Sequence, residues 1–156
     1  MTLENHTSRV VSLSFSADGR YLASAGSPND RVNVWEVASG NRVNALPGRL
    51  VAFAPDGYRL ATIGTRNSLV VYDAESGETV HAFPGEYNSA FAFSADGSLF
   101  AAAAVDQVIV WDASTWEERY SFHYFGGYIG ELAFSPDGGL LAIYGDGISL
   151  WGILGP

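Results

Sequence analysis

The chain has 156 residues, 47% of them apolar, and carries a formal net charge of −9 at pH 7. It has no cysteine, no lysine and no apolar run long enough to span a membrane, which excludes disulfides, thiolate catalysis, Schiff-base chemistry and a helical membrane anchor. An acidic chain repels nucleic-acid phosphates and anionic membranes, so we expect neither as a partner. A reducing, cytoplasmic location fits a chain without cysteine.

A five-residue turn motif recurs four times along the chain. Its Asp residues lie 38, 40 and 41 positions apart, a period typical of repeat architectures. One unit of this length cannot bury its own apolar faces, so neighbouring units must stack. The four copies are FSADG at 15–19, FAPDG at 53–57, FSADG at 93–97 and FSPDG at 134–138.

The first repeat predicts four antiparallel strands in chain order. Apolar and polar residues alternate up to Phe15, and Asp18-Gly19 then suits a tight hairpin turn. A strand of small residues follows, and the next strands are separated by turn clusters rich in Ser, Pro, Asn, Asp and Gly. The predicted strands after the first turn are 21–25, 31–37 and 42–46.

The third strands of the repeats indicate how the repeats pack. Three of the four, at 32–35, 69–72, 108–111 and 148–151, carry apolar residues on both faces, as strands sandwiched between neighbouring sheets do. We predict an all-β fold, a β-propeller with four four-stranded antiparallel blades per chain, forming one domain over 1–156. The expected blades are 9–46, 50–83, 89–122 and 129–154.

These motifs together resemble the WD-repeat β-propeller family over essentially the whole chain. The resemblance rests on the FSxDG-type turn, the small-residue strand after it, and the aromatic residue that ends each third strand, usually before an acid. The aromatic pairs are Trp35-Glu36, Tyr72-Asp73, Trp111-Asp112 and Trp151-Gly152.

The resemblance also implies a structural hydrogen-bond network in each blade, formed by a His, a Ser or Thr, an Asp and the Trp. Only the first repeat has all four residue types, and we interpret its histidine as structural, the alternative being a ligand or a base. The candidate network residues are His6, Ser24, Asp30 and Trp35 in the first repeat, Asp106 and Trp111 in the third, and Asp146 and Trp151 in the fourth.

In the resembled family, the loops that lead from one blade to the next lie on the face that docks partners. Aromatic residues gather in one such loop, where they could form a binding hot spot or cover a seam between blades. Three arginines near that face could engage acidic peptide groups or could simply be solvated. The candidates are His123, Tyr124, Phe125 and Tyr128 in the loop, with Arg9, Arg49 and Arg66.

The number of blades raises the question of assembly, because propellers of the resembled family usually close with seven or eight. The last repeat stops after its third strand, and Thr2-Leu3 aligns with the end of a fourth strand. We therefore expect residues 1–4 to complete the last blade of a ring, and two chains to form a homodimeric ring of eight blades. The alternatives are a closed four-blade monomer and an excised piece of a longer propeller.

No catalytic motif is present, and the three histidines have no metal-binding spacing. We therefore expect neither catalysis nor a cofactor or metal, and predict a protein-interaction scaffold whose partners are itself and an unidentified protein or peptide. One alternative is a natural or engineered fragment that only assembles a ring. Another is an enzyme or small-ligand binder with its site at the central channel.

Overall fold

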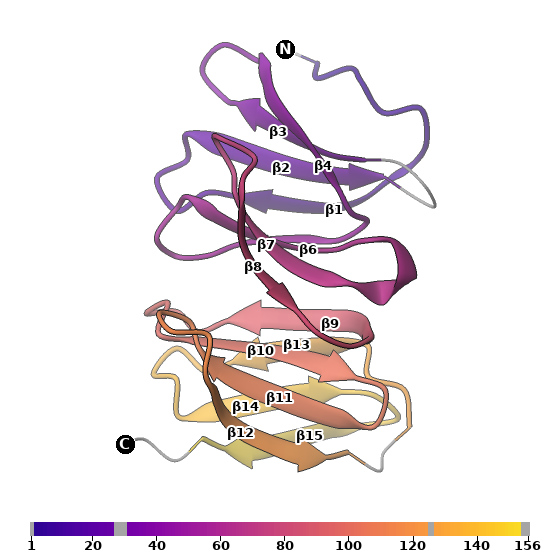
Figure 1. Cartoon of the computed structure of the whole chain (residues 1–156), viewed down its shortest axis with the longest axis vertical. Coiled ribbons are helices and arrows are strands. Elements are labelled where there is room, and N and C mark those ends of the chain that lie inside the picture. The colour runs from indigo at the N-terminus through magenta and orange to yellow at the C-terminus, as the bar shows by residue number, and fades with distance from the viewer. Residues whose placement is uncertain (1, 27–30, 125–126, 154–156) are drawn as a thin grey trace. The chain divides into compact units, whose positions relative to one another are not determined.

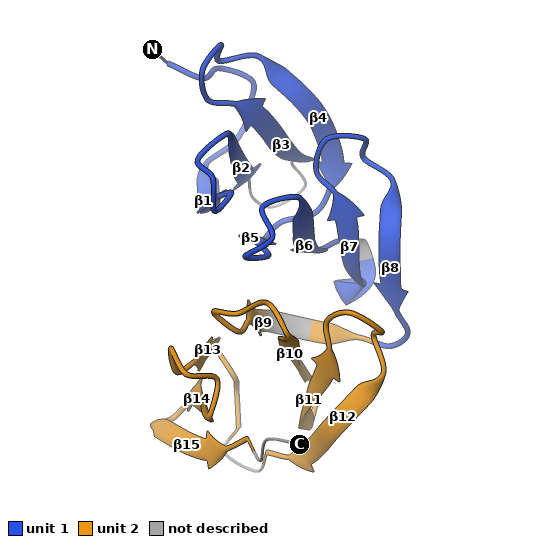
Figure 2. Cartoon of the chain, turned by 90° about the vertical axis from the view of Figure 1, so that its left-hand side faces the viewer, with its two compact units in different colours: residues 1–85 blue, residues 86–156 orange. Residues whose placement is uncertain are grey.

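The computed structural model describes residues 2–26, 31–124 and 127–153, and its regular structure is β-strand apart from one short 3-10 turn, η1 at Thr65–Asn67 (Figure 1). The chain forms two compact units, Met1–Gly85 and Glu86–Pro156, each built from two antiparallel sheets (Figure 2). None of the described helical turns is long and apolar enough to cross a membrane.

The first unit contains blades 1 and 2, each a four-stranded sheet in which consecutive strands are neighbours. The strands of blade 1 are β1 Val10–Phe15, β2 Tyr21–Gly26, β3 Arg31–Glu36 and β4 Arg42–Pro47. Those of blade 2 are β5 Val51–Phe53, β6 Arg59–Ile63, β7 Leu69–Asp73 and β8 Thr79–Phe83.

The second unit contains blades 3 and 4. Blade 3 has four strands, whereas the described part of blade 4 has three. The strands of blade 3 are β9 Tyr87–Phe93, β10 Leu99–Ala104, β11 Gln107–Asp112 and β12 Glu118–His123. Those of blade 4 are β13 Glu131–Phe134, β14 Leu140–Tyr144 and β15 Ile148–Gly152.

The Asp-Gly motifs form the hairpins that open each blade. The glycine of each motif takes the left-handed backbone conformation, as at Gly19 with φ 70° and Gly97 with φ 73°, which costs a residue with a side chain more than glycine. In three of the four turns a serine hydroxyl donates to the Asp two positions later, at 2.6 Å from both Ser16 and Ser94. The motif residues therefore act locally, as turn formers.

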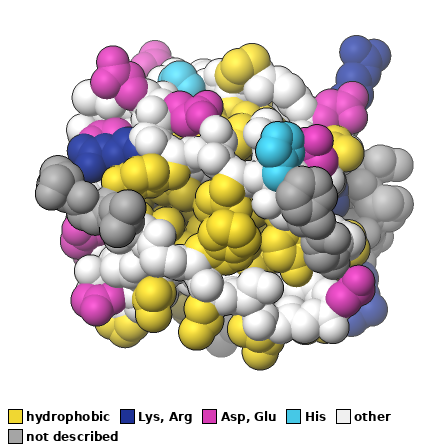
Figure 3. All heavy atoms as spheres, turned by 90° about the horizontal axis from the view of Figure 1, so that it is seen from below, with side chains coloured by type: hydrophobic (Ala, Val, Ile, Leu, Met, Phe, Trp, Pro, Cys, Tyr) yellow, Lys and Arg dark blue, Asp and Glu magenta, His cyan; other side chains and the backbone are white. Residues whose placement is uncertain are grey.

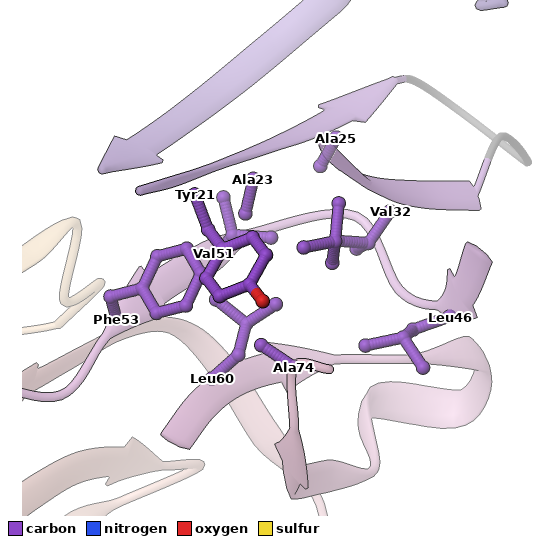
Figure 4. Close-up of a cluster of buried hydrophobic side chains, with 10 residues drawn as sticks. Tyr21, Ala23, Ala25, Val32, Leu46, Val51, Phe53, Leu60 and Ala74 are labelled. Carbon is purple, nitrogen blue, oxygen red and sulfur yellow. The ribbon is translucent and has the colours of Figure 1, made fainter. Parts of the chain in front are cut away.

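Each unit has its core at the seam between its two blades. In unit 1 the small and β-branched residues of β2 and β3 pack on β5 and β6, and Tyr21 lies against Phe53 (Figure 4). In unit 2, Val108 and Val110 of blade 3 share a core with Leu132 and Leu141 of blade 4. One apolar face of β3 and of β11 thus packs in the seam of its unit, and the predicted all-β fold with antiparallel blades is confirmed.

The two ends of the predicted ring lie apart from these cores. Residues 2–9 form no strand, and within the described residues β15 pairs with β14 alone. The completion of the last blade by residues 1–4, in a single ring domain over 1–156, stays a prediction.

Candidate functional site

Blade 1 holds a buried polar network on the face that turns away from blade 2. The indole Nε1 of Trp35 donates to Ser24 Oγ at 2.8 Å, and Ser24 Oγ lies 2.8 Å from His6 Nε2. Strand register places Ser24 opposite both Leu13 and Asn33, so these side chains share one face. The network ties the N-terminal segment to the middle of the sheet; Asp30 lies outside the described residues.

Two members of this network were missed by the sequence analysis. Asn33 Nδ2 donates to His6 Nε2 over 3.2 Å, and Arg42 donates to Asn33 Oδ1 over 3.3 Å. Because the arginine takes the amide oxygen, the amide nitrogen faces the histidine, and Nε2 must accept. The signal was a single asparagine between two valines in an otherwise apolar strand. No sequence pattern distinguished Arg42 as a member of the network.

The candidate residues of blades 3 and 4 have other described contacts. Asp106 lies beside His123, with 3.8 Å between Oδ2 and Nδ1, and Asp146 is exposed. Trp111 is buried and stacks on Phe100 at 6.0 Å between ring centroids. Trp151 stacks on Phe122 of blade 3 at 4.2 Å, so these indoles serve packing.

The aromatic loop divides between the surface and the core. His123 and Tyr128 are exposed, whereas Tyr124 is half-buried and packs against the core of unit 2. A Cβ placed on Gly145 would lie 2.8 Å from the Tyr124 hydroxyl, so the ring fits closely over that glycine. Phe125 lies outside the described residues. Tyr124 thus fits the seam alternative, and His123 and Tyr128 remain candidates for contact with a partner.

The three candidate arginines lie at one end of unit 1. Arg9 precedes β1 and is exposed, Arg49 links blades 1 and 2, and Arg66 lies in the turn between β6 and β7. Arg49 donates to Asn67 Oδ1 over 2.9 Å, which brings it beside Arg66. Each guanidinium can bind a carboxylate through two parallel hydrogen bonds.

Blade 1 exposes apolar residues that correspond to buried residues of blade 2. We call this the leading face, defined by Leu13 and Phe15. Phe15 and Phe53 both open the turn motif, yet Phe15 is 61% exposed and Phe53 only 9%. Blade 1 covers Phe53 in the unit 1 seam. The leading face is therefore one half of a blade seam without its other half.

Blade 4 exposes the complementary half on its opposite side. We call it the trailing face, defined by Leu140, Tyr144, Ile148 and Leu150, which register places on one side of the sheet. Ile148 is 78% exposed, whereas its repeat equivalents Val32 and Val108 are fully buried. Figure 3, which views unit 2 from the side of β12 and β15, shows hydrophobic side chains across the middle of that side.

Within residues 2–26, 31–124 and 127–153, no three His, Cys, Asp or Glu side chains come together in a group that could hold a metal ion. What the geometry does offer is surface: two apolar faces, an arginine-bearing end and exposed ring side chains.

Paired antiparallel sheets stacked face to face, each opened by an Asp-Gly hairpin, define the blades of a β-propeller. Solved structures agree. Over 97% of this chain, the β-propeller domain of Myceliophteria thermophila Cps50 (Swd1) matches with a TM-score of 0.81 and 22% identity, and U3-55K with 0.82 and 19%. The chain covers 55% and 51% of those structures. The computationally designed Ika4 protein matches with 0.80 and 18%, and the chain covers 96% of it. At these identities the likeness shows the fold alone.

Sequence comparison specifies the kind of propeller. A model of the family "WD domain, G-beta repeat" matches residues 1–36. A guanine nucleotide-binding protein subunit beta from Lymnaea stagnalis is 29% identical over 147 residues, and a subunit beta-1 from Caenorhabditis briggsae is 27% identical. The match covers 87% of this chain and 43% of each relative, so the chain spans less than half of their length. The chain is thus similar in sequence to WD-repeat β-propellers, most specifically in its first repeat.

Proposed function

We propose that the chain is a non-enzymatic protein-interaction scaffold, and that two copies join end to end into an eight-bladed ring. The family supports the scaffold role, and the cytoplasm is the proposed location. The observation that carries the assembly is the exposure of repeat-equivalent residues: positions that blade seams bury inside each unit are open on the leading and trailing faces.

The leading and trailing faces correspond to the two sides of a blade seam. Inside each unit, a seam forms between the trailing side of one blade and the leading side of the next. The free trailing face of one copy can therefore meet the free leading face of another in the same way. Burying one large apolar side chain contributes roughly 1.5–3 kcal/mol. Association costs roughly 4–15 kcal/mol, so several must be buried together, and two such seams in a closed ring meet that need.

A whole protein of this size supports treating four blades as the assembling unit. The designed Ika4 chain is covered almost completely by this one, so a chain of about this length and fold exists as a protein of its own. A large apolar patch left open on a monomer would also favour non-specific aggregation, which closure of the ring avoids.

The test is the mass in solution, measured by light scattering after size exclusion across a dilution series. We expect twice the chain mass of 16.7 kDa for the wild type. Ile148→Glu and Phe15→Glu should each yield monomer, because forming the ring would require burying the new carboxylate in a seam between copies. Val105→Glu is the matched control, since Val105 is 72% exposed and lies outside both faces.

A wild-type chain that stays monomeric at all concentrations would contradict the ring, as would a loss of the dimer in the Val105→Glu control. A mass that spreads with concentration, without a defined dimer, would indicate an incomplete piece of a longer propeller. The scaffold role would survive either result, because it rests on the family.

A further inference from the structure

Charge is distributed unevenly between the two units. Residues 1–85 contain eight acids and seven arginines, a formal charge of −1, whereas residues 86–156 contain nine acids and one arginine, a formal charge of −8. A chain of net charge −9 thus has one unit that is nearly neutral. Local basic surface on that unit can attract anions, because exposed charges more than about 10 Å away are largely screened at 0.1 M salt.

Within unit 1 the charges are further separated between the two ends of the blades. We call the end at which β1, β3, β5 and β7 begin the arginine end. It carries Arg9, Arg31, Arg49 and Arg66, and the one described acid in its connecting segments is Glu4. The opposite end carries Asp18, Glu36, Asp56, Asp73, Glu75 and Glu78 together with Arg20, Arg42 and Arg59, so acids outnumber arginines there.

Strand pairing brings these arginines to one surface. Arg31 pairs with Pro47 at the end of β4, and the Arg49 amide two residues later donates to the Ile63 carbonyl over 2.9 Å. The side chain of Arg49 then reaches Asn67 beside Arg66. The arginine end therefore gathers Arg31, Arg49 and Arg66 along the connections of blades 1 and 2.

The backbone at Arg66 adds an independent observation. Arg66 and Asn67 take left-handed conformations, with φ 60° and 58°, in a turn where asparagine tolerates this and arginine is disfavoured. Holding an arginine in this conformation is unfavourable, and such backbone strain clusters at functional sites. Arg66 is exposed and makes no hydrogen bond or ion pair with the described residues, and the same is true of Arg9.

We infer that the arginine end of unit 1 docks an acidic segment of a protein partner, a stretch rich in Asp and Glu. The inference rests on the proposed scaffold function and names the chemistry of its partner. Planar guanidinium groups at this end match successive carboxylates, each through two hydrogen bonds. The acids on unit 2 and on the opposite end of unit 1 repel a polyanion elsewhere, which restricts it to this end.

The experiment uses the full chain and a fluorescein-labelled peptide of alternating glutamate and serine, followed by fluorescence anisotropy at about 0.1 M salt. The same peptide with glutamine in place of glutamate is the ligand control. The test variant is Arg9→Gln with Arg66→Gln. The matched variant is Arg20→Gln with Arg119→Gln, which changes the net charge equally, and both of its arginines already pair with acids, Glu75 and Asp112.

We expect only the glutamate peptide to bind, and the test variant to bind it about tenfold more weakly, because two exposed guanidinium–carboxylate pairs are lost. The matched variant should bind as the wild type does. Arg9→Lys with Arg66→Lys keeps the charge but loses the paired hydrogen bonds, and should fall between them. Added salt should weaken binding of the wild type, a readout that needs no variant.

Equal binding by the test and matched variants would overturn the inference, and so would no binding by the wild type. Tighter binding of a single-stranded oligonucleotide of equal charge would overturn it in favour of nucleic acid. Light scattering on the same samples reports assembly separately. If the chain is monomeric but binds the peptide, the ring proposal fails and the docking inference stands. If the chain is dimeric but does not bind the peptide, the docking inference fails and the ring proposal stands.

Discussion

Ser24 is the residue on which the blade 1 network depends, because its hydroxyl contacts both Trp35 and His6. Ser24→Ala removes the acceptor of a buried indole and should lower the free energy of unfolding by about 1–3 kcal/mol. Urea unfolding measures this, with Ser39→Ala as a control, since the Ser39 bond to Glu36 is exposed. Amide exchange in residues 2–9 should also become faster. Equal effects of the two variants would contradict the structural role of the network.

Trp116 occupies a position that two other blades give to glycine. Gly40, Gly77 and Trp116 all close the turn after the third strand with φ between 62° and 77°, and all donate to the carbonyl four residues earlier. Trp116 retains this conformation while its ring packs edge-on against Phe100, at 6.0 Å. The packing explains why the residue is a tryptophan.

Two substitutions separate packing from backbone strain at Trp116. Trp116→Ala and Trp116→Gly both lose the ring, but only glycine escapes the left-handed penalty. We therefore expect the alanine variant to be the less stable of the two by about 1 kcal/mol. Chemical denaturation of both variants measures the difference. A glycine variant no more stable than the alanine variant would show that the turn carries no such penalty.

At the scale of the element, one of the four opening hairpins lacks the serine that stands two positions before the Asp in the others. Ser94 donates to Asp96 Oδ1, and with the Ser98 amide it holds the pKa of Asp96 below its ordinary value. The pKa values of Asp18 and Asp137 are lowered in the same way, first by Ser16 and Ser135. Blade 2 has Ala54 at this position, and there the Arg59 amide donates to Asp56 Oδ1.

This difference predicts a pH dependence. A depressed pKa in the folded state contributes stability that is present above the unfolded value near 3.8 and is lost as pH falls through the folded pKa. Ser94→Ala should cost about 0.5–1.5 kcal/mol at pH 7, where its hydrogen bonds count in full. The cost should shrink below pH 3. Urea unfolding at both pH values checks it, and a cost independent of pH would exclude the carboxylate as its cause.

Sequence predicted the elements well because their signals are local. An Asp-Gly pair determines a hairpin by itself, and alternation or apolar runs determine the strands around it, as Phe15 to Trp35 illustrate. The hydrogen-bond network of blade 1 was harder to predict from the sequence. Asn33 and Arg42 join it through strand register, which no single strand encodes, and Tyr124 packs in the core only because Gly145 approaches it closely. Ile148 is exposed because no blade in the described residues covers the trailing face, and the pattern of apolar residues in a strand does not show whether its blade has a neighbour.

At the scale of the whole molecule, assembly links stability to concentration. A ring that forms only from folded chains stabilises them by mass action, so the Tm of the wild type should rise with protein concentration. Ile148→Glu should remove that rise, while Val105→Glu keeps it. Scanning calorimetry over a dilution series provides the measurement. A Tm independent of concentration in the wild type would mean that the end faces remain open in the folded chain.

The leading and trailing faces differ from each other, which gives the proposed contact a direction. A contact of this kind closes into a ring when the rotation per copy allows it and otherwise continues as a filament. A variant altered on one face alone, such as Leu150→Glu, can still join a wild-type copy through the other face. Nothing can then add to its altered side, so a small excess of that variant would act as a chain terminator and trap open pairs of wild-type and variant chains.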